Sequence, residues 1–187
     1  LHYPLRRQRQ MCIRDRFTTH KNETGIKPNH LRIAKDSVGV LAPTKPIILE
    51  TVSLRNIRRV TNYVIGFVQS IPYSTLESRI TSSGAGFSVP AKVLWENQGD
   101  CDSKMTLTVA MLRSLMPRIS MALVYIDNHA FIGIDILPEG EDIKIALDGR
   151  TFVLADPTGP VQLPLGDISF DSEQAILAGH YTAELFD

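Results

Sequence analysis

Cysteine is scarce in this sequence, which holds only Cys12 and Cys101 among its 187 residues. A disulfide scaffold needs several cysteine pairs, so we expect two free thiols. No apolar run approaches the ~18 residues of a membrane-spanning helix, and the first residues lack the apolar middle region of a secretion signal. We therefore expect a soluble domain of the cytoplasm or cell envelope. Because the chain starts at Leu1 instead of Met, a membrane anchor is expected only in upstream sequence, if anywhere.

The common signatures of metal and nucleotide sites are also missing. The sequence has no CxxC pair, no cluster of histidines, no Walker-type phosphate loop and no GxGxxG run. Such sites need convergent ligands or glycine-rich turns. We therefore expect no metal and no cofactor.

The formal net charge is zero, but the two parts of the chain differ in sign. Residues 1–60 carry 13 Lys and Arg against 4 Asp and Glu, while residues 61–187 carry 7 against 16. A basic arm can bind nucleic acid or anionic lipid. This arm lacks interleaved aromatic residues and any recognition motif, so we expect no nucleic-acid partner.

The length and the local composition predict one folded domain preceded by an arm. Residues 1–16 show no helix or strand period and resemble translated adapter sequence, so we interpret them as non-native. Residues 17–46 are polar and close with two prolines, which favours a flexible linker. The folded domain is expected over residues 47–187.

Three helices are predicted in the first half of the domain. Apolar residues recur at helical spacing from Ile57 to Ile71, with Ser53 as the N-cap and Pro72 as the stop. Pro90 suits the first turn of a short helix that runs through Trp95. Residues 100–116 are apolar on two faces, which predicts a buried central helix.

Three or four β-like runs follow, over residues 121–126, 129–137, 143–147 and 151–156. Turn residues separate them, so we expect antiparallel hairpins. The tail from Pro157 onward is predicted to be weakly helical at its end.

Cys101 stands where the central helix begins, directly after Gly99 and Asp100. The unpaired N–H groups and the dipole of a helix N-terminus stabilise a thiolate and lower its pKa from about 8.5. Asp100 can cap the helix through the N–H of Asp102 or Ser103. We expect the carboxylates of Asp100 and Asp102 to point away from the sulfur, because they would disfavour its anion.

A nucleophilic thiol needs a base, and His129 is the only histidine within residues 31–179. It shares strand parity with Phe131 and Gly133, so its ring can face the sheet surface on which the helix packs. Asp156 ends a later strand and can accept the far N–H of the imidazole.

Each of these residues also has an ordinary explanation. A cysteine at a helix start is more often a small buried apolar residue, a histidine at a turn is usually solvated, and an aspartate before proline is usually a turn former. Only their order and spacing together favour chemistry.

Together these residues resemble the core of the transglutaminase-like superfamily of cysteine peptidases. The motif order is Cys, His, Asp, and the matching segments are residues 99–104 (GDCDSK), 112–115 (LRSL), 129–130 (HA) and 155–158 (ADPT). Residues 67–73 (FVQSIPY) also resemble the helix that precedes the nucleophile in bacterial members. The resemblance covers residues 47–158, and the three motifs together are more specific than any one of them.

The resemblance implies an α+β fold with a papain-like core, in which the nucleophile helix packs on an antiparallel sheet. It assigns Cys101 as nucleophile, His129 as base and Asp156 as the orienting residue. The chain departs from the family pattern at residues 131–133 (FIG) and 150–152 (RTF), and some members carry an acidic residue in place of Ser103.

These groups would run acyl transfer on a peptide or protein substrate through a thioester. We expect the backbone N–H of Cys101 and the side chain of Gln69 to stabilise the oxyanion. Gln98 and Trp95 compete with Gln69 for that role, although core packing is the preferred interpretation of Trp95.

Three functions stay open at this point. The leading hypothesis is a thiol peptidase or amidohydrolase, and the second is a protein-glutamine transferase that uses the same triad. The third is a catalytically silent domain that binds peptides or cell-surface polymers.

Overall fold

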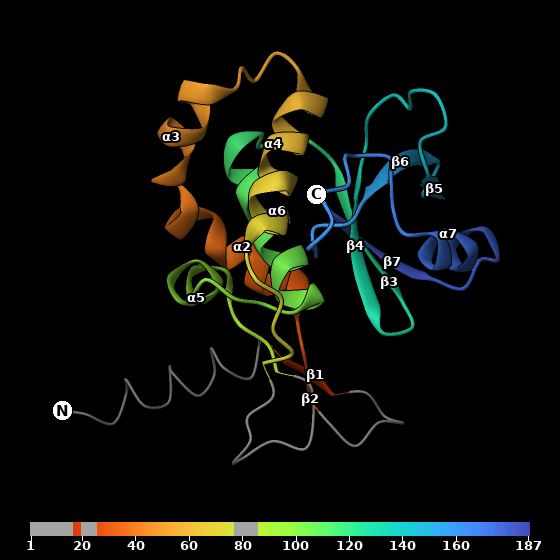
Figure 1. Ribbon diagram of the computed structural model, residues 1–187, viewed down its shortest axis with the longest axis horizontal. Helices are drawn as coiled ribbons and strands as arrows, with labels where there is room; N and C mark the ends of the chain where they lie inside the picture. The colour runs from red at the N-terminus through yellow and green to blue at the C-terminus, as the bar shows by residue number, and fades with distance from the viewer. Residues whose placement is uncertain (1–16, 20–25, 77–85) are drawn as a thin grey trace.

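The computed structural model describes residues 17–19, 26–76 and 86–187, arranged as Figure 1 shows. The segment interpreted as non-native, residues 1–16, lies outside the described residues. Strands β1 (Phe17–Thr19) and β2 (Ile26–Pro28) pair with each other in antiparallel register.

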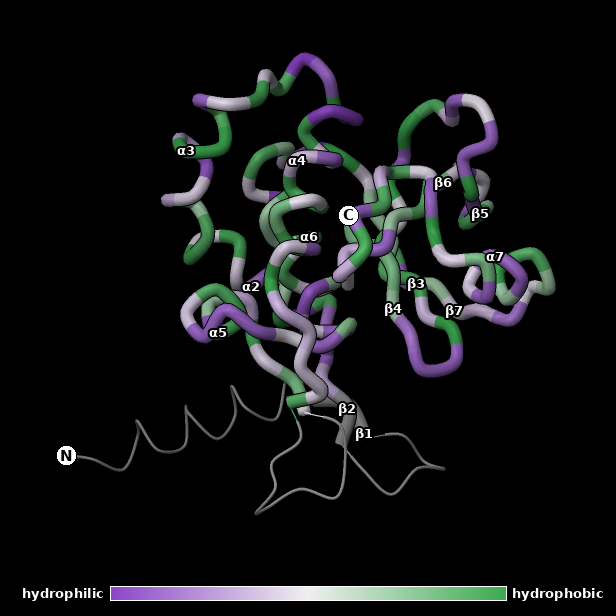
Figure 2. Tube along the Cα trace, viewed as in Figure 1, coloured by the Kyte–Doolittle hydropathy of each residue, from purple (hydrophilic) through white to green (hydrophobic). Residues whose placement is uncertain are grey.

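The main sheet has five antiparallel strands in the order β5-β6-β4-β3-β7. Its strands are β3 (Met121–Ile126), β4 (His129–Ile134), β5 (Lys144–Leu147), β6 (Arg150–Ala155) and β7 (Thr182–Phe186). The predicted antiparallel hairpins are therefore confirmed. Asp148 and Gly149 both have positive φ, of 50° and 75°, as the tight turn between β5 and β6 requires. The hydrophilic turn that joins β3 to β4 contrasts with the apolar strands around it (Figure 2).

Three helices follow the sequence predictions closely. Helix α4 (Ile57–Ser70) begins after Asn56 instead of Ser53, because the Asn56 side chain accepts the N–H of Arg59 at 2.9 Å. Helix α5 is Pro90–Glu96, and the central helix α6 is Cys101–Leu115. Between residues 103 and 112 every residue of α6 is buried, so the prediction of a buried helix is confirmed.

The prediction of a flexible linker over residues 17–46 is wrong for most of that range. Helix α2 (His30–Leu41) and helix α3 (Thr44–Thr51) occupy its second half, and α2 packs against α6. Residues 17–46 are polar on average, but α2 has one apolar side, on which Ile33, Ala34 and Leu41 are buried. Pro46 is tolerated because it lies in the first turn of α3.

The tail also differs from the prediction, because it contributes a strand as well as a helix. Helix α7 (Phe170–Leu177) is capped by Ser169, whose side chain accepts the N–H of Ser172. Strand β7 then pairs with β3 at the edge of the sheet. Strand β7 completes the sheet, and helix α7 covers one of its faces.

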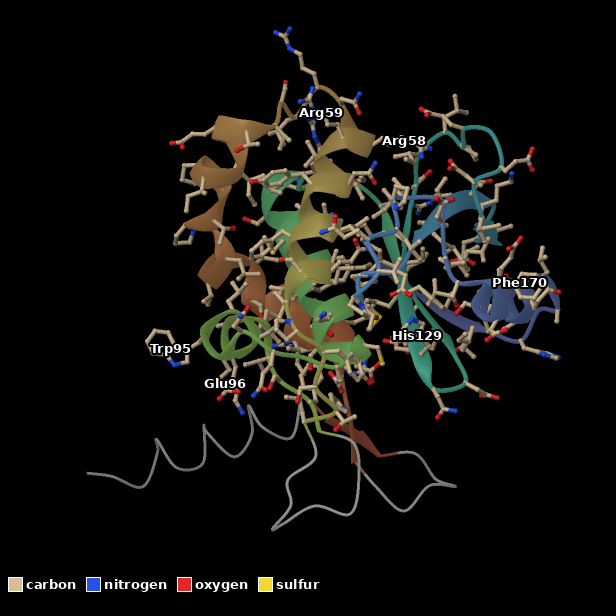
Figure 3. All side chains as sticks on the ribbon, viewed as in Figure 1. Arg58, Arg59, Trp95, Glu96, His129 and Phe170 are labelled. Carbon is tan, nitrogen blue, oxygen red and sulfur yellow. The ribbon has the colours of Figure 1, made fainter. Side chains whose placement is uncertain are left out.

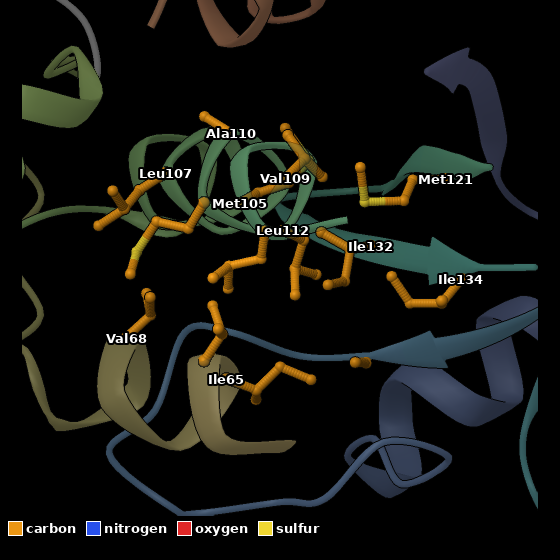
Figure 4. Close-up of a cluster of buried hydrophobic side chains, with 14 of the residues drawn as sticks. Ile65, Val68, Met105, Leu107, Val109, Ala110, Leu112, Met121, Ile132 and Ile134 are labelled. Atoms are coloured by element: carbon orange, nitrogen blue, oxygen red, sulfur yellow. The ribbon is translucent and has the colours of Figure 1, made fainter. Parts of the chain in front are cut away.

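The elements form three layers, with α2 to α6 on one face of the sheet and α7 on the other (Figure 1). Alternate strand residues divide between two cores: Ala130, Ile132 and Ile134 of β4 join the core beneath the helices, whereas Phe131 joins the core beneath α7. Figure 4 shows Ile65 and Val68 of α4 facing α6 in the first core. Within the described ranges, no helix is both long and apolar enough to cross a bilayer.

Arg58 joins α4 to the loop between β4 and β5. Its guanidinium donates to both carboxylate oxygens of Asp142, at 3.2 and 2.5 Å, and to the carbonyl of Leu165 at 3.2 Å. Burial raises the pKa of Asp142, but hydrogen bonds from Arg58 and from the backbone of Glu139 outweigh it and hold the pKa below its ordinary value. This pair fixes the helical layer to the sheet.

Replacing Arg58 with Met should lower the free energy of unfolding by about 1–2 kcal/mol, because it leaves the Asp142 carboxylate half-buried without its cation. Arg59→Met is the matched control, since Arg59 is the exposed neighbour in the same helix and points away from the sheet (Figure 3). Urea denaturation followed by circular dichroism measures both. Equal losses in the two variants would contradict this role of Arg58.

Candidate active site

Cys101 is the first residue of α6, as the sequence predicts. Asp100 is the N-cap, and its side chain accepts the N–H of Ser103 at 2.9 Å. The predicted capping role of Asp100 is therefore confirmed. Cys101 is half-buried against the core beneath the helices, so its thiol combines partial burial with a helix N-terminus.

The environment of the thiol differs from the prediction at Asp102. The Cys101 thiol donates to Oδ1 of Asp102 at 3.6 Å, so this carboxylate points at the sulfur and not away from it. Burial raises the pKa of Cys101 to about 12, and the charges of Asp102 and Asp100 act in the same direction. The backbone N–H of Asp102 lowers the pKa, as expected at a helix N-terminus, but this effect is smaller.

His129 and Asp156 form a direct pair. Nε2 of His129 lies 2.8 Å from Oδ2 of Asp156, and the backbone N–H of Thr158 donates to Oδ1 at 2.9 Å. Burial raises the pKa of Asp156, but the hydrogen bond and charge of His129 outweigh it and leave the pKa lowered. An ionised Asp156 orients the imidazole and leaves Nδ1 as the nitrogen that can act on another group.

The face of the sheet on which this pair lies differs from the prediction. His129 shares parity with Phe131, whose ring it meets edge-on at 4.6 Å between centroids. Phe131 belongs to the core beneath α7 and not to the core beneath α6. The sequence gives the parity of a strand but not which face the helices cover, and that is why the predicted face is wrong.

One chain of contacts connects the start of α6 to the start of β4. Oδ2 of Asp102 lies 3.8 Å from Nε2 of His30, and Nδ1 of His30 lies 3.1 Å from the hydroxyl of Tyr125. Tyr125 pairs across the sheet with Ala130, the neighbour of His129. Within the described residues the thiol has no hydrogen bond to His129, although both stand at the first position of their elements.

A second connection joins α6 to the segment that follows β6. Lys104, one turn after Cys101, is fully buried and donates to the carbonyl of Ile71 at 2.5 Å and to the carbonyl of Thr158. Burial lowers the pKa of Lys104, while the charge of Asp156 raises it. Lys104 thus holds the loop of Asp156 against the first turn of α6.

Sequence reasoning missed this role of Lys104. The available signal is a single lysine three residues after Cys101, within a helix that is otherwise apolar on two faces. A lysine at such a position cannot reach solvent, so it must find buried acceptors.

Gln69 does not have the donor role predicted for it. Its Nε2 donates to the carbonyl oxygens of Asp156 at 2.7 Å and Leu163 at 2.9 Å, so both of its N–H groups are engaged. The side chain is buried, with 3% exposed. Its amide holds the loop after β6 and is not available to an oxyanion. Gly159 lets the same loop approach closely, since a Cβ there would lie 2.5 Å from the Gln69 carbonyl oxygen.

Trp95 does not pack in the core, contrary to the preferred interpretation. It is 89% exposed and projects from α5 into solvent (Figure 3). Gln98 is half-buried beside Gly99. Neither residue has a contact in the structure that supports the competing donor role.

In the part of the chain that the structure describes, no group of three or more His, Cys, Asp or Glu side chains gathers as a metal site would require. Comparison of the chain with protein-family models, with curated proteins and with solved structures finds no match.

Replacing Gln69 with Leu should lower the free energy of unfolding by about 2–4 kcal/mol. The change leaves one buried and one partly buried carbonyl without donors, and losing the donor of a buried carbonyl costs about 1–3 kcal/mol. Ser70→Ala, at the exposed next position of α4, should change it by less than about 0.5 kcal/mol. Urea denaturation of both variants is the measurement, and a Gln69→Leu loss no greater than that of Ser70→Ala would rule out the anchoring role.

Proposed function

We propose that this domain is a cysteine-dependent acyl-transfer enzyme of the transglutaminase-like type, with a papain-like core. Cys101 is the nucleophile, His129 the base and Asp156 the residue that orients it. The observation that carries the proposal is the 2.8 Å pair of His129 and Asp156, whose loop Lys104 ties to the first turn of α6. A histidine and an aspartate from distant parts of the chain thus meet in the geometry that a catalytic base and its orienting residue need.

The proposed reaction starts with transfer of the thiol proton to Nδ1 of His129. The thiolate then attacks the carbonyl carbon of an amide, and the imidazolium returns the proton to the leaving amine as the C–N bond breaks. Water, deprotonated by the same imidazole, attacks the resulting thioester and releases the acid. Asp156 stays ionised throughout and stabilises the imidazolium.

The oxyanion of the tetrahedral intermediate needs donors other than Gln69. The backbone N–H of Cys101 is the first of α6 and has no partner within the helix. It points toward the space in front of the helix N-terminus, where the helix dipole also favours negative charge. We assign this N–H as the principal donor.

The raised pKa of Cys101 favours a second candidate, a domain of the same fold that binds peptides or polymers without catalysis. A thiol with a pKa of about 12 is almost wholly protonated at neutral pH. In the enzymatic proposal the imidazole supplies the missing activation, because a His129 cation near the sulfur favours the thiolate. The two candidates therefore differ in whether Cys101 becomes acylated.

Acylation of Cys101 by a p-nitrophenyl ester distinguishes the proposed enzyme from the binding domain. The wild-type chain and Cys12→Ser should release a burst of about one equivalent of p-nitrophenol, with the added acyl mass on Cys101. Cys101→Ala should give no burst, and His129→Gln should slow acylation by about 100-fold or more. A burst that survives Cys101→Ala, or its absence from the wild-type chain, would favour the binding domain.

A glutamine peptide as acyl donor then separates hydrolase from transferase. The leading hypothesis predicts free glutamate peptide as the main product, even when a primary amine is added. Predominant transfer to the amine would assign the transferase instead. His180→Ala is the matched histidine control, because His180 is exposed at the end of α7 and should leave both products unchanged.

A further inference from the structure

Another histidine, His30, lies near Asp102, the neighbour of the proposed nucleophile, and comes from the part of the chain expected to be a linker. His30 is the first residue of α2, where the side chain of Asn29 caps the helix by accepting the N–H of Arg32 at 3.0 Å. The imidazole is buried, with 8% exposed. It stacks on Tyr125 and contacts the ring of Phe87. A buried imidazole at the start of a helix requires specific partners to offset its desolvation.

Asp102 stands between this histidine and the thiol. One carboxylate oxygen accepts from the Cys101 thiol at 3.6 Å, and the other lies 3.8 Å from Nε2 of His30. The opposite nitrogen of His30 is fixed by the hydroxyl of Tyr125 at 3.1 Å. Three elements, α2, α6 and β3, therefore meet in one continuous line of polar groups that ends at the sulfur.

Within the described residues, the charges shown to act on the thiol and on Tyr125 are acidic. Asp100 and Asp102 belong to the N-terminus of α6, and Glu184 of β7 acts on the hydroxyl of Tyr125. Burial and the charges of Glu184 and Asp102 raise the pKa of Tyr125, so its hydroxyl stays neutral. Among the side chains of this line, the imidazole of His30 is the one that can carry a positive charge.

We propose that His30 is a positioning residue for Cys101, which holds the Asp102 carboxylate and offsets its negative charge so that the thiol can ionise. His30 acts through Asp102 and does not take the thiol proton itself. Its Nε2 faces the carboxylate and its Nδ1 faces Tyr125, whereas His129 retains Nδ1 for the base role. In this arrangement α2 belongs to the active site, and docking of α2 on α6 sets the reactivity of the thiol.

The inference depends on the proposed function for its catalytic meaning, but the coupling itself is a property of the thiol. Opposite charges within about 4–6 Å favour each other's charged form, and an uncompensated carboxylate disfavours a neighbouring thiolate. Removing His30 should therefore reduce the thiolate fraction. Removing the charge of Asp102 should abolish that dependence on His30.

Alkylation of Cys101 by iodoacetamide in the full chain tests the coupling. Cys12→Ser provides a single-thiol background, since the sequence has only two cysteines. In that background His30→Gln should slow alkylation at pH 7 by about three- to tenfold. Asp102→Asn should speed it, and adding His30→Gln to Asp102→Asn should change the rate by less than about twofold. His180→Ala should have no effect.

The pattern of this double-mutant cycle decides the proposal. An unchanged rate in His30→Gln, or the same loss with and without Asp102→Asn, would overturn it. If the circular dichroism spectrum shows that His30→Gln does not fold like the parent, the variant Tyr125→Phe is used in its place. Tyr125→Phe removes the hydroxyl contact to His30 and keeps the aromatic ring. A smaller slowing that again vanishes with Asp102→Asn is then expected, and no slowing would overturn the proposal.

The same variants separate failure of this inference from failure of the proposed function. The alkylation cycle reports only the ionisation of the thiol, whereas the ester burst reports acylation. Coupling between His30 and Asp102 without acylation of Cys101 would support the positioning role of His30 and contradict the proposed enzymatic function. Acylation of Cys101 without coupling between His30 and Asp102 would support the proposed enzyme and contradict the positioning role of His30.

Discussion

The first turn of α6 is the constraint on which the rest of the site depends. Lys104 is buried there, and its ammonium joins the carbonyl of Ile71, at the end of α4, to the carbonyl of Thr158, after β6. A buried cation cannot be moved without losing these acceptors, and so the three segments keep a fixed geometry. Cys101 and Asp156 are each only a few residues from those contacts. Their mutual placement is therefore a consequence of where one lysine finds its acceptors.

Two opposing electrostatic effects meet at the Cys101 sulfur. The N–H groups at the start of α6 favour the thiolate, whereas burial and the carboxylates of Asp100 and Asp102 disfavour it. Asp100 is committed to capping the helix, so only the charge of Asp102 can be offset locally. Two histidines have separate tasks in our account. His129 supplies the base with Asp156 behind it, and His30 compensates Asp102.

Local patterns predict the sheet and the central helix well, because alternation and helical spacing depend on neighbours in the chain. The strands near residues 121–126 and 151–156, the Asp100 cap and the buried α6 all follow from such patterns. Helix α2 was missed because its buried residues are few and lie among polar ones. The roles of Gln69, Lys104 and His30 depend on partners more than 30 residues away, which no local pattern encodes.

The pKa of the Cys101 thiol in the presence and absence of His129 tests the central claim most directly. It is obtained from the pH dependence of alkylation in Cys12→Ser and in Cys12→Ser combined with His129→Gln. The account predicts a lower apparent pKa in the protein that keeps His129, and a rise by about one pH unit or more on His129→Gln. An apparent pKa that is high and the same in both proteins would contradict it.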